Sequence, residues 1–239
     1  MTDVLDSYRL LLQGAWITVQ LTVLGSALAL VLALVFGLAG TSARVWVRAL
    51  NRVYVEFFRG TATLVLMYWF FYALPLVGFR FTPMAAAVLS LGLNIGAYGA
   101  EVVRGSLNAV PKAQYEATVA LNFSPFQRMR RVLLPQAVAL MLPPFGNLLI
   151  ELMKGTAIVS LITIGDLTFR AQQIRGATGE TLWTFVAILV LYFVIAQVLQ
   201  LGVRFAERRV DRMLGRGPAP KDDPGAVVAA GASGTGVNP

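Results

Sequence analysis

The chain has 239 residues, of which 57% are apolar and only 13% charged, whereas soluble domains carry about 25% charged residues. Its net charge of +8 would suit a nucleic-acid partner if the basic residues formed one surface. They lie instead in short clusters between long uncharged stretches, which argues against nucleic acid. Because the chain has no cysteine and no histidine, disulfides, thiolate catalysis and histidine-based metal sites or proton relays are excluded.

Long uncharged segments alternate with the basic clusters along the whole chain. A helix needs about 20 apolar residues to cross about 30 Å of hydrocarbon. These segments lack the polar faces that the helices of a soluble all-helical protein would show. We therefore expect an all-α membrane protein with about five transmembrane helices in one domain, residues 1–216. The approximate spans are 15–39, 60–79, 83–103, 138–163 and 181–203.

The positions of lysine and arginine predict the orientation in the membrane, since basic residues mark cytoplasmic loops. They cluster before the second span, between the third and fourth spans, and after the fifth. This alternation predicts an N-terminus outside and a C-terminus in the cytoplasm. Asp3 and Asp6 stand where a signal peptide would be basic, so we expect the first span to be retained. Residues 217–239, rich in Gly, Pro and Ala, predict a disordered tail.

A polar, basic insert at about 108–136 separates the third and fourth spans. Pro111 suits the first turn of a helix, and the good helix formers that follow it extend that helix for about three turns. Asn122 then interrupts the helix. A turn between two helices commonly needs one residue with positive φ, which glycine adopts freely and asparagine next most readily. The alternative is that Asn122 is only a polar loop residue.

A second short helix is expected immediately after this turn. Ser124, Pro125 and Gln127 form a capping-box pattern, with serine at the N-cap, proline at the first helical position and glutamine three after the cap. Pro135 should end this helix. The insert is then a cytoplasmic elbow of two helices, suited to dock a partner. The alternative is a helix pair on anionic lipid, since Arg128, Arg130 and Arg131 would also suit headgroups.

The elbow resembles the EAA loop of ATP-binding-cassette import permeases. Glu116-Ala117-Thr118, then Leu121-Asn122, then Leu134-Pro135 follow that family's order of Glu-Ala-Ala, glycine and Leu-Pro. Thr118 replaces the second alanine of the family pattern. Asn122 replaces the glycine, which is the substitution that backbone sterics permit most readily.

The resemblance extends from Gly14 to about Arg212. The segments "FFRGTATLV" (57–65), "GAYGAEVVRGSLNAVPKAQYEA" (96–117) and "LLPQAVALMLPPFGNLLIELMKGTAIVSLI" (133–162) resemble polar amino-acid permeases. Within that class, "QYEATVALNF" (114–123) and "IGDLTFRAQQI" (164–174) look most like the ectoine and hydroxyectoine uptake permease.

The resemblance implies the permease subunit of an importer and not an enzyme. It implies two cytoplasmic ATPase subunits, a second permease subunit (a sister protein or a second copy) and an extracellular solute-binding protein. It also implies the inner membrane as location, and an amino acid or ectoine-type solute moved by alternating access. This sequence has no phosphate-binding Gly-x-x-x-x-Gly-Lys-[Ser/Thr] loop, so we expect no cofactor in this chain and ATP-Mg on a partner. The elbow residues expected to contact the ATPase are Tyr115, Glu116, Ala117, Leu121, Asn122, Phe126 and Arg130.

Polar residues within the spans are candidates for the substrate path, because they are costly in a membrane. Glu151 and Lys154 are three apart on one helix face; they line the path, or they only neutralise each other. Asn94, Tyr98 and Glu101 share one stripe of the third span and would suit a zwitterion. The alternative is that Glu101 pairs with Arg104.

Two other functional classes remain open. A secondary transporter or channel for a small zwitterion would need an ion or proton path, which these ionisable residues could supply. A membrane scaffold would bind a soluble partner without moving any solute.

Overall fold

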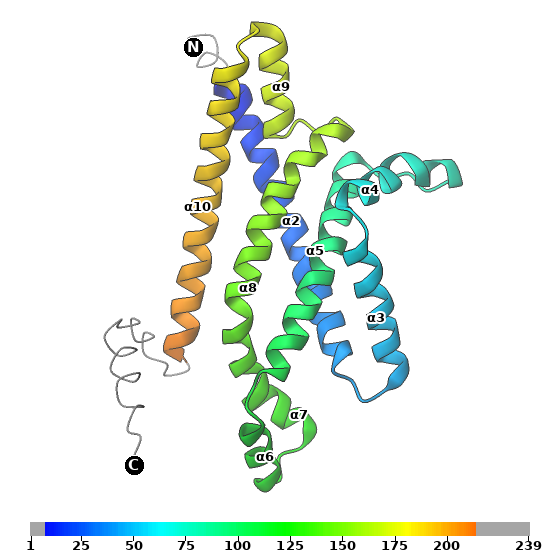
Figure 1. Ribbon diagram of the computed structural model, residues 1–239, viewed down its shortest axis with the longest axis vertical. Helices are drawn as coiled ribbons and strands as arrows, with labels where there is room; N and C mark the ends of the chain where they lie inside the picture. Colours follow the sequence, from blue (N-terminus) through cyan, green and yellow to red (C-terminus); the bar gives the residue numbers. More distant parts are fainter. Residues whose placement is uncertain (1–7, 214–239) are drawn as a thin grey trace, which may run out of the picture.

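The computed structural model describes residues 8–213, and helices joined by short connections form this part of the chain, without a strand. Five long helices run roughly along the longest axis of the molecule (Figure 1). They are α2 (Tyr8–Gly40), α3 (Val45–Gly60), α5 (Pro83–Asn108), α8 (Leu134–Gly155) and α10 (Thr181–Met213). The expected all-α membrane fold is therefore confirmed. The tail expected at 217–239 lies outside the described residues.

Small residues let α2 and α5 approach closely along their length. A Cβ built on Gly99 would lie 2.7 Å from the Cβ of Ala33, and one on Gly37 would lie 2.5 Å from the Cβ of Val103. Gly92 and Gly96 are buried in the same seam, where a Cβ would meet Leu28 or Leu32. Without a hydrophobic effect between helices in lipid, such small-residue seams supply the van der Waals contact that holds a bundle together. The α2–α5 pair is the centre of the fold.

The second membrane segment differs from the straight span expected over 60–79. The apolar run 63–77 forms α4 (Thr63–Tyr68), a π-helical turn η1 (Trp69–Ala73) and a 3₁₀ turn η2 (Leu74–Val77), bent by 99° from α3. It projects sideways from the bundle (Figure 1). The break occurs where Thr61 and Ala62 have extended backbone. The basic helix α3 thus runs beside α5, where we expected only a loop.

Pro135 does not end the second elbow helix as we expected. The elbow helices α6 (Lys112–Ala120) and α7 (Pro125–Arg128) are followed by a π-helical turn η3 (Met129–Leu133), which continues directly into α8. Proline removes an amide and clashes with the carbonyl four residues earlier in an α-helix. The wider π-turn and a place in the first turn of α8 relieve both effects. Pro125–Ile162 is consequently one helical rod of 38 residues.

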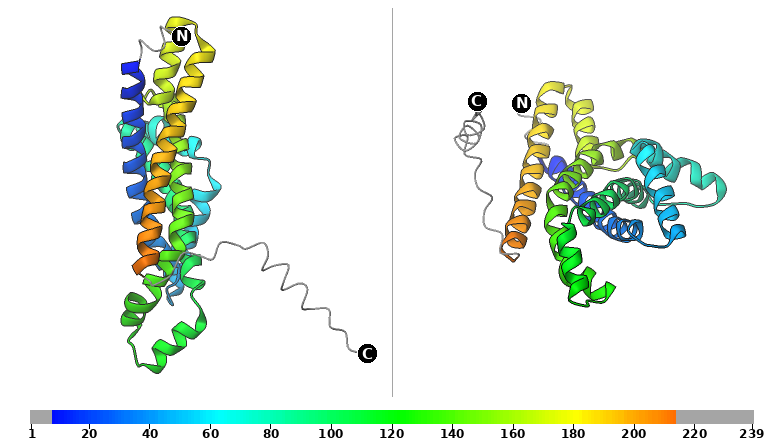
Figure 2. Two further views of the ribbon diagram at one scale, coloured as in Figure 1. Left: turned by 90° about the vertical axis from the view of Figure 1, so that its left-hand side faces the viewer. Right: turned by 60° about the horizontal axis from the view of Figure 1, so that its bottom comes forward.

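Length and apolarity qualify four helical stretches among residues 8–213 as membrane spans, and the bent pair α3–η2 makes up to five. They alternate in direction, so α2 begins at the end opposite the elbow and α10 finishes at the elbow end (Figures 1 and 2). A 3₁₀ turn η4 (Thr156–Ile162) extends α8, and α9 (Leu167–Thr178) lies at the end opposite the elbow. The chain therefore has two distinct ends for interaction.

Candidate coupling elbow and polar sites of the bundle

Asn122 adopts the positive φ that the sequence predicts. Its φ is 54°, in the left-handed region. The amide of Phe123 donates to the carbonyl of Thr118 at 3.0 Å, and the amide of Asn122 donates to the carbonyl of Val119 at 2.9 Å. This pair of bonds is the Schellman motif, in which a left-handed residue ends a helix and satisfies its last carbonyls. The turn between α6 and α7 is consequently fixed by its backbone.

The capping box at the start of α7 is also confirmed. The Ser124 hydroxyl accepts from the Gln127 amide at 3.3 Å, and the Gln127 side chain accepts from the Ser124 amide at 3.0 Å. Reciprocal capping satisfies two amides that a helix start otherwise leaves unpaired. Because the Schellman turn and the capping box are adjacent, the four residues 121–124 suffice to connect α6 to α7.

Side chains then connect the two arms of the elbow. The Arg128 guanidinium carbon lies 4.3 Å from the centre of the Tyr115 ring, a cation–π contact between α7 and α6. The Gln136 amide donates to the Gln114 side chain at 3.3 Å, linking α8 to α6. The buried Thr118 donates to the Tyr115 carbonyl at 2.6 Å. The two arms of the elbow are therefore held together by the cation–π contact, and one side-chain hydrogen bond ties α6 to the base of α8.

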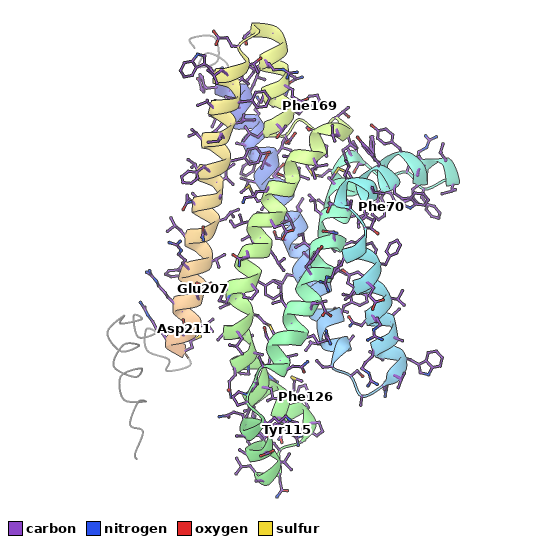
Figure 3. The ribbon with its side chains drawn as sticks, in the orientation of Figure 1. Phe70, Tyr115, Phe126, Phe169, Glu207 and Asp211 are labelled. Atoms are coloured by element: carbon purple, nitrogen blue, oxygen red, sulfur yellow. The ribbon has the colours of Figure 1, made fainter. Side chains whose placement is uncertain are left out.

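The outer surface of the elbow presents all seven residues expected to contact an ATPase. Each of them is exposed: Tyr115, Glu116, Ala117, Leu121, Asn122, Phe126 and Arg130. Leu121 is 67% and Phe126 70% exposed, and exposed apolar side chains that gather at one place indicate an interaction surface. Phe126 also borders a hollow of about 480 Å³ that Gln127, Arg130 and Arg131 complete. Figure 3 shows Tyr115 and Phe126 at this end of the molecule.

The stripe Asn94–Tyr98–Glu101 faces α3. The Asn94 amide donates to the carbonyls of Phe58 at 2.7 Å and Thr61 at 3.2 Å. The Tyr98 hydroxyl donates to the Arg59 carbonyl at 3.5 Å. Asn94 therefore satisfies carbonyls that the bend after α3 leaves without helical partners.

Glu101 makes the ion pair that we gave as its alternative role. Its two carboxylate oxygens accept from Arg104, from Nη2 at 2.6 Å and from Nε at 3.1 Å. A two-point contact of this kind fixes both side chains. The Glu101 carboxylate is consequently engaged within its own helix.

Glu151 and Lys154 have a different environment from this stripe. Both side chains are exposed on α8. Within residues 8–213 no ion pair joins them; the ion pairs present there join Arg52 to Glu56 and Arg104 to Glu101. The two charges are therefore open toward whatever lies beside α8 in the membrane.

A buried network around Asp166 was not among the residues expected from the sequence. Asp166 is fully buried and caps α9, accepting from the amides of Thr168 at 3.1 Å and Phe169 at 3.0 Å. The Tyr192 hydroxyl donates to the same carboxylate at 3.5 Å, and the hydroxyl of Thr18 accepts from the Leu167 amide at 3.2 Å. Asp166 lies outside the membrane-spanning helices, and burial raises its pKa to about 6. An aspartate just before a helical segment is a capping signal that the sequence does contain.

The Asp166 network connects three elements but is not a metal site. Its residues come from α2, the start of α9 and α10, in the region where Figure 3 labels Phe169. No group of three or more acidic side chains in residues 8–213 is arranged to hold a metal ion. The network therefore fixes how α9 packs on its neighbours.

Comparison with known proteins supports a transport role. Residues 16–212 match the family described as "binding-protein-dependent transport system inner membrane component". A probable amino-acid ABC transporter permease, y4tF of Sinorhizobium fredii, is 44% identical over 209 residues, covering 85% of this chain and 88% of that protein. The glutamine transport permease GlnP of Escherichia coli is 36% identical over 203 residues, covering 84% and 93%.

The fold comparison agrees with the sequence comparison. One chain from the crystal structure of an amino acid ABC transporter with histidines superimposes with a TM-score of 0.80 at 31% identity. The match covers 86% of the present chain and 96% of that one. The helical bundle and the elbow described above are therefore those of a transporter subunit.

Proposed function

Because this chain belongs to the family of inner-membrane components of binding-protein-dependent transport systems, we propose that it is the permease subunit of an ATP-driven importer for a polar amino acid. Members of this family are multi-pass transport permeases and not enzymes. The observation that carries the proposal is the match over residues 16–212, which includes the elbow. A soluble ATPase would supply the energy, since this sequence carries no phosphate-binding loop of its own.

The proposed partners occupy different ends and sides of the bundle. Cytoplasmic ATPase subunits contact the elbow, and ATP-Mg binds to them, with no cofactor in this chain. A solute-binding protein approaches the opposite end, near α9. A second permease subunit, a sister protein or another copy, completes the pore. Basic residues at the elbow and at the end of α10 support a cytoplasmic elbow and C-terminus, with the N-terminus outside.

The geometry of the elbow supports a role in force transmission. Leu121 and Phe126 are large, exposed and apolar, and Glu116 and Arg130 beside them are exposed charges. Apolar anchors rimmed by charge are typical of protein interfaces. The Schellman turn and the capping box keep this surface rigid. Closure of the ATPases on ATP would thus move the elbow as a unit and tilt α8, which gives alternating access.

Glu151 and Lys154 are the substrate-path residues that we favour. Their exposure without a mutual ion pair leaves a carboxylate and an ammonium to face the second permease subunit. An amino-acid zwitterion needs such a pair of opposite charges. Asn94, Tyr98 and Glu101 would act less directly, because their polar groups contact α3 or Arg104. Asn94 and Tyr98 set the position of the bend after α3.

The similar proteins favour an amino acid as substrate, since GlnP is a glutamine permease and the solved transporter was crystallised with histidines. The segments 114–123 and 164–174 keep an ectoine-type compatible solute as the second candidate. Binding of glutamine, histidine and ectoine to the partner solute-binding protein distinguishes the candidates, because that subunit sets much of the selectivity. Tight binding of ectoine alone would replace the amino acid in the proposal.

ATPase activity of the reconstituted complex tests the coupling role. We expect Glu116→Ala, or a deletion of 112–133, to abolish solute-stimulated ATP hydrolysis. Val198→Ala, a change of an exposed residue near the middle of α10 and away from both ends, serves as the control and retains stimulation. Full stimulation without the elbow would refute the proposal. Uptake that continues without any ATPase and stops when the ion gradient is dissipated would indicate a secondary transporter.

A further inference from the structure

Helix α3 carries two exposed stripes of opposite character on adjacent faces. One stripe is apolar, with Trp46, Leu50, Val53 and Phe57 exposed in a repeat of four and three residues. The other stripe is charged and is formed by Arg48, Arg52, Glu56 and Arg59. The remaining face packs on the bundle, where Tyr54 and Val55 are buried beside α5. An amphiphilic ligand could follow both stripes at once.

The charged stripe borders a cavity of about 560 Å³ between α3 and α5. Its walls include four arginines and two glutamates: Arg48, Arg52, Arg59, Arg104, Glu56 and Glu101. Each glutamate is already neutralised. Glu56 pairs with Arg52 at 3.4 Å, and Glu101 pairs with Arg104 at 2.6 Å. The cavity therefore keeps a surplus of two positive charges.

The surplus comes from Arg48 and Arg59. One Arg48 nitrogen, Nη1, donates to the carbonyls of Ser42 and Ala43, both at 2.9 Å, and its other donors are left for a ligand. The Arg59 guanidinium carbon lies 5.1 Å from the centre of the Tyr98 ring. Neither arginine meets a carboxylate among residues 8–213. Guanidinium groups without an acid partner are suited to bind phosphate.

A buried acceptor in the same cavity wall is also unsatisfied. Asn51 is 6% exposed, and its Oδ1 has no hydrogen-bond partner in the part of the chain that the structure describes. An unpaired buried amide oxygen is costly. A ligand hydroxyl entering the cavity would satisfy it. The wall thus offers donors for an anion and an acceptor for a neighbouring hydroxyl.

We propose that this cavity binds the headgroup of an anionic phospholipid, phosphatidylglycerol in type, whose acyl chains lie along the apolar stripe of α3. The phosphate would contact Arg48 and Arg59, and a glycerol hydroxyl would reach Asn51. A free anion would not use the exposed stripe beside the cavity. The N-terminal end of α3 lies toward the elbow (Figure 1), which is the end where anionic lipids of the inner leaflet attract arginine. Trp46, 89% exposed near that end, occupies the position that tryptophan favours at a membrane interface.

Tryptophan quenching tests this site without requiring transport. The full-length permease carries Trp16→Phe, Trp69→Phe and Trp183→Phe, so that Trp46 alone fluoresces, and is reconstituted in phosphatidylcholine–phosphatidylglycerol vesicles. Bromine is placed on the acyl chains of either lipid. We expect brominated phosphatidylglycerol to quench Trp46 more efficiently than brominated phosphatidylcholine. For the same loss of fluorescence, the membrane should need a roughly fivefold larger fraction of brominated phosphatidylcholine. Equal quenching by both lipids would overturn the site, and quenching by neither would mean that protein covers this face.

Two double variants test whether the lipid preference depends on the cavity or on basic residues elsewhere at the same end of the bundle. Arg48→Gln combined with Arg59→Gln removes the two arginines proposed to contact the phosphate, and should remove the preference for phosphatidylglycerol. Arg208→Gln combined with Arg209→Gln removes the same charge from an exposed surface at the same end of the bundle, and should keep the preference. A preference that survives in the first pair contradicts the proposal. Loss of the preference in excess inorganic phosphate at constant ionic strength would assign the cavity to a free anion instead.

Discussion

The guanidinium carbon of Arg128 lies 4.3 Å from the centre of the Tyr115 ring, so that a residue of α7 covers a residue of α6. Arg128 is half-buried there, and Tyr115 remains 47% exposed. This contact connects the two arms of the elbow on the side opposite the Asn122 turn. The turn and the cation–π contact together leave the angle between α6 and α7 little freedom.

We expect the Tyr115–Arg128 contact to support coupling through the face of the ring and not through the hydroxyl. Tyr115→Phe should therefore preserve solute-stimulated ATP hydrolysis, whereas Tyr115→Leu should reduce it by about threefold, because exposed cation–π contacts contribute roughly 0.5–1 kcal/mol. A double-mutant cycle with Arg128→Gln measures the contact itself. Additive effects of Tyr115→Leu and Arg128→Gln would show that the ring and the guanidinium act independently.

The stability of variants at Asn122 should follow the free-energy cost of a positive φ for each residue type. Asn122→Gly should match or slightly exceed the thermal stability of the parent, because glycine adopts this backbone freely. Asn122→Ala should lose about 1 kcal/mol, since Cβ disfavours the left-handed region. Thermal unfolding of the purified permease in detergent gives the comparison. Equal stability of the alanine and glycine variants would indicate that the turn relaxes to another conformation.

The seam between α2 and α5 should tolerate no added methyl group at its centre. In Gly99→Ala the new Cβ would lie 2.7 Å from Ala33 Cβ and 3.1 Å from Phe145, and we expect overpacking to cost about 1–3 kcal/mol. Gly105→Ala on the same helix is the matched control, because nothing lies within 4 Å of its Cβ. The control should be neutral or stabilising, since alanine is the better helix former. Fluorescence-detected size exclusion of heated samples measures the thermal stability of both variants. A Gly99→Ala variant as heat-resistant as Gly105→Ala would contradict the tight packing between α2 and α5.

The stability of the Asp166 network should depend on pH. Burial raises the pKa of Asp166 from the ordinary 3.8 to about 6, so the folded state binds the proton more tightly than the unfolded state. Protonation therefore stabilises the fold: the contribution is complete below about pH 4 and is lost as the pH rises through 6. Protonation of Asp166 contributes at most about 3 kcal/mol to the free energy of unfolding. In Asp166→Asn this group no longer titrates.

The measurement for Asp166 is the difference in thermal midpoint between the parent and Asp166→Asn. We expect the thermal midpoint of the parent to fall relative to that of Asp166→Asn as the pH rises from 4 to 6. Above that range the difference should stay constant. Asparagine remains a good N-cap, so the variant should keep α9 in place. A difference that does not change with pH would mean that Asp166 titrates at its ordinary pKa.

Asn94 should control the bend after α3. Asn94→Leu removes the donor to the carbonyls of Phe58 and Thr61 and leaves them unpaired, which costs roughly 1–3 kcal/mol. Cysteine labels on either side of Thr61 should then report a broader distance distribution by electron paramagnetic resonance. Unchanged distances with a raised KM for solute would instead place Asn94 in direct contact with substrate.

Local rules account for the parts of the fold that the sequence predicted well. The Asn122 turn and the Ser124–Gln127 capping box depend on neighbouring residues only, and both were predicted correctly. The membrane class followed from the spacing of charges, which needs no tertiary information.

Features that depend on a partner helix were not predicted. The bend after Gly60 is compensated by Asn94, a residue more than thirty positions away, so no pattern around 60–79 reveals it. Pro135 was expected to end a helix because proline usually does, but the π-turn at 129–133 accommodates it. Asp166 carries a visible capping signal, yet its burial comes from contacts with α2 and α10.

The uninterrupted rod from Pro125 to Ile162 has a mechanical consequence. Its 38 residues extend over about 57 Å at 1.5 Å per residue. Where this stretch tilts as one body, each degree of rotation about its elbow end carries the far end through roughly 1 Å. Had the helix ended at Pro135, a flexible joint there would have kept the rotation of the elbow from reaching α8. A tilt of a few degrees at the membrane surface is therefore enough to move Ile162 by the width of an atom or more.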